Sequence, residues 1–115
     1  MKEFLMLIRE GAAYDQMSPE EMQACVAKHV EWVNSLTQKG QYKDANPLET
    51  VGAVIRGNMV TDGPYIESKE CVSGYYILLA GSLEEAITIA KGCPDLAMGC
   101  TLEVREMTNL NDQEN

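Results

Sequence analysis

The chain has 115 residues, 45% of them apolar and 23% charged, and a formal net charge of −9. This length supports one soluble, globular domain with a single core. The acidic balance argues against a nucleic-acid partner, because phosphate binding needs clustered Lys and Arg. No run approaches the roughly 20 apolar residues of a membrane helix. We therefore predict a cytoplasmic protein with neither a nucleic-acid nor a membrane partner.

The first third of the sequence predicts a strand and a long helix. Residues 3–9 (EFLMLIR) contain five consecutive apolar side chains, which is typical of a central strand covered on both faces. Ser18 can cap a helix that has Pro19 in its first turn and Glu21 completing a capping box. The helix should run to about Lys39 and end at Gly40. Its apolar stripe has His29, the only histidine, near its centre and comprises Met22, Cys25, Val26, Val30, Val33 and Leu36.

The remaining elements are shorter. Residues 41–48 read as irregular or as a short edge segment, and residues 50–56 and 58–61 as a hairpin that turns at Gly57-Asn58. A second buried strand is expected at 74–80, where Tyr75 and Tyr76 should face opposite sides, so that at most one lines a given pocket. A helix over about 82–91 and a strand over 100–106 complete the chain.

This order of strand, helix, hairpin, strand, helix and strand predicts an α+β fold with a βαββαβ plan and one elaborated hairpin. Two helices cover one face of an antiparallel sheet. Because residues 4–8 and 75–80 are apolar on both faces, a second copy of the chain is expected to cover the other face. The partner predicted in this way is the chain itself, as a homodimer.

Several segments also resemble a known family. They are DGPY at 62–65, ESKE at 67–70 and GYY at 74–76, together with the opening strand, SPEEM, KGCP and the closing LEVRE. The chain resembles the DGPF branch of the YCII-related family over most of residues 1–106. The resemblance implies a ferredoxin-like subunit that pairs into a dimeric α+β barrel, with a His–Asp active site. We place this domain at residues 1–107 and a polar C-terminal tail at 108–115.

The predicted catalytic residues are His29 and Asp62. A histidine exchanges protons near neutral pH, and an aspartate that bonds one ring nitrogen fixes its tautomer. The resemblance implies that the helix and the DGPY aspartate supply this pair, inside a cavity beneath the helix. Alternatively, His29 is a hydrogen-bonded core histidine, and Asp62 forms the turn before Gly63.

The loop that follows Asp62 supplies the predicted substrate-binding residues, which are Tyr65, Glu67, Ser68 and Lys69. Their alternative role is that of a solvated loop with weak surface ion pairs. The four cysteines show no metal-ligand spacing, and buried thiols are favoured over disulfides. Cys71 adjoins the loop. The sequence has no cofactor motif, so we predict no metal and no cofactor.

These residues predict a small enzyme that acts on an unidentified small molecule by proton transfer, with isomerase or lyase chemistry. His29 would be the general acid and base and Asp62 its partner. The alternative is a non-catalytic ligand-binding or regulatory dimer, in which both residues only shape a pocket. The family resemblance implies that such a dimer would be linked to transcription or stress response.

Overall fold

The computed structural model describes residues 1–9, 17–49, 51–63 and 71–110, with the backbone alone at positions 62 and 63. The elements in chain order are β1 (Lys2–Arg9), α1 (Pro19–Gln38), β2 (Tyr42–Pro47), β3 (Gly52–Arg56), β4 (Met59–Gly63), β5 (Val72–Ala80), α2 (Leu83–Ala90), the 3₁₀ helix η2 (Pro94–Met98) and β6 (Thr101–Glu106).

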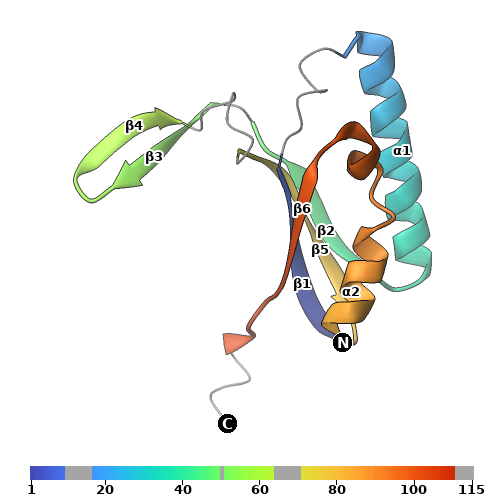
Figure 1. The fold of residues 1–115 in the computed structure, drawn as a ribbon. Coiled ribbons are helices and arrows are strands. Elements are labelled where there is room, and N and C mark those ends of the chain that lie inside the picture. The colour runs from blue at the N-terminus through green and yellow to red at the C-terminus, as the bar shows by residue number, and fades with distance from the viewer. Residues whose placement is uncertain (10–16, 50, 64–70, 111–115) are drawn as a thin grey trace.

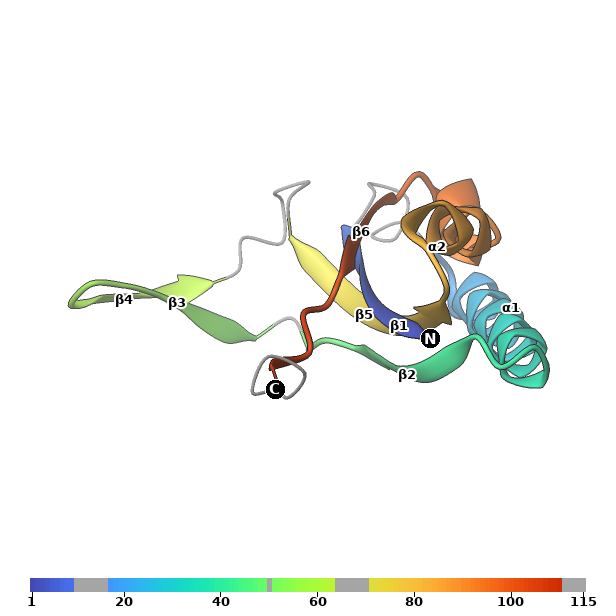
Figure 2. The same ribbon diagram turned by 90° about the horizontal axis from the view of Figure 1, so that it is seen from below.

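Four strands form an antiparallel sheet in the order β2-β5-β1-β6. Figures 1 and 2 show α1, α2 and η2 together on one side of this sheet. The register places Phe4 of β1 between Leu78 of β5 and Glu106 of β6. The predicted α+β fold, with its ferredoxin-like subunit and two helices on one face, is confirmed.

Residues 42–47, for which the sequence left two interpretations, form the edge strand β2. Pro47 is the last residue of this strand, as expected where a backbone N–H is not needed. β2 and β5 approach closely at Gly74, where an added Cβ would lie 3.1 Å from the carbonyl oxygen of Asn46. This position therefore favours glycine.

The hairpin β3–β4 is a separate two-stranded ladder. It turns at Gly57, whose φ of 59° lies in the left-handed region, as the Gly-Asn turn predicted. Figures 1 and 2 show that it extends away from the sheet and helices. The hairpin is thus an insertion between the second and third strands of the main sheet, and Asp62 pairs with Ala53 along its ladder.

Helix α1 begins and ends where the sequence predicts. The Glu21 N–H donates to Oγ of Ser18 at 3.1 Å, and the Ser18 N–H donates to Oε1 of Glu21 at 3.4 Å, which closes the capping box. Gly40 follows the helix with a φ of 69°. These ends fix the turn that carries His29.

The apolar stripe predicted for α1 is only partly buried. Cys25 and Leu36 are buried, whereas Val26 and Val30 are 57% and 55% exposed. The two valines line a cavity between α1 and the β2–β5 edge instead of entering the core. The core itself lies between α1, α2 and the near face of the sheet, and its largest fully buried side chains are Phe4, Met6 and Leu78.

The far face of the sheet also carries apolar side chains. Burial alternates along β1 and β5, so that Leu5, Leu7, Ile77 and Leu79 are half-buried on the side opposite the helices. The expectation that both faces of these strands are apolar is confirmed. Within the described residues, no helix is both long and apolar enough to cross a membrane.

Candidate active site

A cavity of about 610 Å³ lies between α1 and the ends of β2 and β5. Its walls are largely apolar. They include Val26, Val30 and Val33 on the helix, Pro47 at the end of the edge strand and Leu48 directly after it. His29, Tyr76 and Asp95 also line it. An apolar cavity with a few convergent polar groups is the usual form of a small-molecule site.

His29 is bonded through both ring nitrogens. Nε2 lies 3.0 Å from Oδ1 of Asp95, and Nδ1 lies 2.5 Å from the Tyr76 hydroxyl. With Asp95 ionised, its carboxylate only accepts hydrogen bonds, so Nε2 is the protonated nitrogen and donates the hydrogen bond to Asp95. In the neutral ring Nδ1 is then an acceptor, and the Tyr76 O–H donates to it. The two partners therefore fix both the orientation and the tautomer of the ring.

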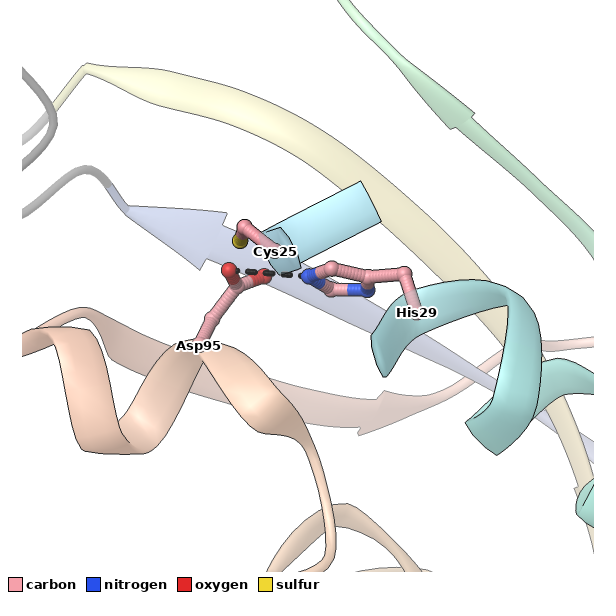
Figure 3. Close-up of side chains that lie close together, drawn as sticks. All are labelled: Cys25, His29 and Asp95. Carbon is pink, nitrogen blue, oxygen red and sulfur yellow. Dashed lines mark hydrogen bonds and ion pairs between the residues drawn. The ribbon is translucent and has the colours of Figure 1, made fainter. Parts of the chain in front are cut away.

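Asp95 is the most buried charged residue of the site, with only 2% of its surface exposed. It lies in the first turn of η2, behind Pro94, and Figure 3 shows it reaching from that helix toward His29 on α1. The Cys93 thiol donates weakly to its other oxygen, Oδ2, at 3.8 Å. A buried carboxylate needs partners of this kind, since an isolated buried charge is strongly disfavoured.

Tyr76 is held in place by neighbouring rings. Its ring stacks with the ring of His29 at a centroid distance of 5.9 Å and meets Trp32 edge to face at 4.9 Å. Burial raises the pKa of Tyr76 above its ordinary value, and the nearby Cys93 and Asp95 raise it further. The hydroxyl is therefore protonated at neutral pH and acts as a hydrogen-bond donor.

Cys25 completes the cluster that Figure 3 shows. It lies one helical turn before His29 on α1 and is buried. The ligand atoms of Cys25, His29 and Asp95 all lie within 4.8 Å of one another. All four cysteines fall in the described residues, and none of these four forms a disulfide.

The structure leaves part of the sequence prediction untested. The structure describes Asp62 in β4 by its backbone, and its side chain lies outside the described part of the chain. The predicted substrate-binding residues Tyr65, Glu67, Ser68 and Lys69 lie outside the described residues. A direct bond from Asp62 to His29 would require Asp95 or Tyr76 to leave its ring nitrogen. His29 lines a cavity beneath α1, as expected.

Two residues of the site were missed in the sequence. Asp95 is the only charged residue between Lys91 and Glu103, and a lone carboxylate in such an apolar stretch is a signal of a buried, partnered charge. Tyr76 was not among the residues predicted for the site. The expectation that only one of Tyr75 and Tyr76 could line a pocket was wrong, because both tyrosines line this cavity.

The fold and the site together define a ferredoxin-like α+β subunit with a histidine–aspartate pair beside a cavity. The chain belongs to the YCII-related domain family, whose model matches residues 3–108. This agrees with the resemblance seen in the sequence.

A solved structure is similar over nearly the whole chain. It is 5-chloro-2-hydroxyhydroquinone dehydrochlorinase from Burkholderia phenoliruptrix, in complex with 2,5-dihydroxybenzoquinone, with 18% identity and a TM-score of 0.55. The match covers 96% of this chain and 97% of that one. At this identity the likeness shows the fold. No curated protein matches the sequence.

Proposed function

We propose that this protein is a small-molecule enzyme that catalyses proton transfer, of lyase or isomerase type, through a relay of Asp95, His29 and Tyr76. The observation that carries the proposal is the bonding of both ring nitrogens of His29. One nitrogen meets a buried carboxylate and the other meets the hydroxyl of a tyrosine that lines the cavity. A base, its orienting carboxylate and a group facing the ligand space are the parts that acid–base catalysis needs.

The relay moves one proton in two coupled transfers. The Tyr76 oxygen accepts a proton from the substrate while the Tyr76 hydroxyl proton passes to Nδ1 of His29. The ring then carries two protons and one positive charge, which the Asp95 carboxylate stabilises across the 3.0 Å contact. The tyrosine need not persist as a phenolate, which fits its raised pKa. Reversing the transfers returns the proton to another substrate atom or to a leaving group.

The cavity favours a compact and largely apolar substrate. Its volume of about 610 Å³ is suited to a molecule with one or two rings, and valines form much of the helix wall. The structurally similar protein is a dehydrochlorinase, which eliminates hydrogen chloride from a hydroxylated ring compound. This similarity supports elimination on a hydroxylated ring as the first chemistry to test, although it shows the fold alone.

The proposal is tested by hydrogen exchange in deuterated water. The protein is incubated with a panel of hydroxylated and halogenated ring compounds, and ring C–H signals are followed by proton NMR. We expect deuterium uptake or halide release with the parent protein for at least one compound. We also expect a fall of about 10²–10⁴-fold in the His29→Ala and Asp95→Asn variants.

Asp44→Asn is the matched control, because Asp44 is an exposed carboxylate on β2 outside the cavity lining. It should exchange at the parent rate. If a compound that binds the cavity is never exchanged or eliminated, the acid–base proposal fails and a ligand-binding role is supported. If His29→Ala exchanges the compound as fast as the parent, the relay is wrong.

A further inference from the structure

Three side chains with metal-ligand atoms converge beside the cavity. Cys25 and His29 project from consecutive turns of α1, and Asp95 comes from η2 on the opposite side (Figure 3). Their sulfur, nitrogen and oxygen atoms all lie within 4.8 Å of one another. Zinc sites with bonds of about 2.0–2.3 Å place such atoms about 3.3–3.8 Å apart. Binding of a cation would therefore draw the three ligand atoms closer together than they lie in the metal-free chain.

We propose that Cys25, His29 and Asp95 form a binding site for a divalent transition-metal cation of the zinc class. A thiolate, an imidazole and a carboxylate are the donor types that zinc prefers, and three protein ligands leave one position for water or a ligand. All three residues line the cavity, so that this fourth position is reached from it. The inference does not rest on the proposed proton transfer.

Charge balance favours a divalent cation at this place. A thiolate and a carboxylate together carry two negative charges, and both residues are buried, with Cys25 8% and Asp95 2% exposed. Two buried negative charges repel each other and are poorly solvated. One divalent cation neutralises both, whereas magnesium or calcium would favour oxygen ligands alone.

The outer contacts are also those of a metal site. Histidine ligands usually bond a neighbouring group through their second nitrogen, and ligating carboxylates are hydrogen-bonded in turn. Here the Tyr76 hydroxyl meets Nδ1 of His29 at 2.5 Å, which aims Nε2 at the cluster. The Cys93 thiol meets Oδ2 of Asp95. Two of the three ligands are therefore already oriented.

Binding requires a defined movement of protons. The proton on Nε2 of His29 moves to Nδ1, which then donates a hydrogen bond to the Tyr76 oxygen. Nε2 is left free of its proton and can bind the cation. The Cys25 thiol loses its proton to water, so that one proton is released for each cation bound when the ring is neutral.

The test uses the full chain after treatment with a chelator. We expect one equivalent of CoCl₂ to give a thiolate-to-cobalt charge-transfer band in the near ultraviolet. The band should be lost in Cys25→Ser and kept in Cys71→Ser, whose thiol lines the cavity but lies outside the cluster. Zinc affinity, measured by competition with a chromophoric chelator, should fall about 10–100-fold in Tyr76→Phe.

A readout on the parent protein needs no variant. The chain has one histidine, so its ring ¹⁵N signals are unambiguous. One equivalent of ZnCl₂ should move the ring proton from Nε2 to Nδ1. Absence of the cobalt band in the parent, its persistence in Cys25→Ser, or an Nε2 that stays protonated with zinc present would each overturn the proposal. None of these results bears on turnover by the metal-free protein, which the exchange assay measures separately.

Discussion

The Tyr76 hydroxyl lies 2.5 Å from Nδ1 of His29. The Tyr76 ring is otherwise held by contacts with Trp32 of α1 and Tyr42 of β2. Tyr76 and His29 are 47 positions apart and come from different layers of the fold. Both residues line the cavity, and the second ring nitrogen of His29 meets Asp95. In the proposed relay the tyrosine meets the substrate and passes its hydroxyl proton to the histidine.

Replacing Tyr76 by phenylalanine should separate this role from ring packing. The ring contacts with Trp32 and His29 remain, while Nδ1 loses its donor. We expect the free energy of unfolding to fall by about 1–3 kcal/mol, since a buried polar atom is left without a partner. Turnover of an exchanged compound should fall by about 10²–10⁴-fold. Denaturant titration and the exchange assay measure the two effects.

Tyr42→Phe is the matched control for this change. Tyr42 also meets the Tyr76 ring, edge to face at 6.5 Å, and it also lines the cavity, but it does not bond His29. It should retain most of the turnover. Equal losses in the two variants would show that the cavity needs hydroxyl groups in general, and the assignment of Tyr76 to the relay would be rejected.

The sequence predicted what depends on local chemistry. The capping box at Ser18 and the stop at Gly40 set α1, and with it the place of His29, because these signals lie within a few residues of the helix ends. The contact between His29 and Asp95 joins residues 66 positions apart and depends on how η2 packs against α1. No local pattern encodes that packing. The DGPY motif directed attention to Asp62 instead.

A comparison of Asp95→Asn with Asp62→Asn tests which aspartate orients the ring. An amide at position 95 can donate as well as accept, so Nε2 should lose its fixed proton and the tautomers should mix. We expect the ring ¹⁵N signals of His29 to show a pure Nε2–H form in the parent and a mixture in Asp95→Asn. The Asp62 variant should leave the tautomer unchanged if Asp95 alone holds it. If the His29 tautomers mix only in Asp62→Asn, the aspartate that orients the ring is Asp62, as the sequence predicted.

Alkaline pH should destabilise the fold through Cys93. Burial raises the pKa of this thiol from 9.0 to about 12 in the folded chain. Between these values the unfolded chain releases the proton and the folded chain keeps it, so the free energy of unfolding falls as pH rises. The contribution is fully present below pH 9.0 and is lost toward pH 12. Tyr76, whose pKa is also raised, adds a loss that begins above pH 10.0.

Denaturant midpoints measured across this interval check the prediction. In Cys93→Ala the denaturant midpoint should decline less steeply above about pH 9 than in the parent. In the double variant with Tyr76→Phe the decline should be smaller still. The baseline is Cys71→Ala, whose slope should match that of the parent because Cys71 is only partly buried. A parent protein whose midpoint is constant up to pH 11 would contradict the proposed cause.

Pairing of two copies through the open face of the sheet remains a proposal, and it has a direct test. Leu5, Leu7, Ile77 and Leu79 form an apolar surface on that face, and the Arg9–Glu103 and Lys43–Glu3 ion pairs lie on the same side. An apolar face of this kind is typical of a dimer contact.

We expect the parent to sediment as a dimer at micromolar concentration and Leu7→Glu as a monomer, because a buried, unpaired carboxylate at the contact is strongly disfavoured. Gln23→Glu adds the same charge on the exposed side of α1 and should leave the dimer intact. A monomeric parent would show that this face is open to solvent.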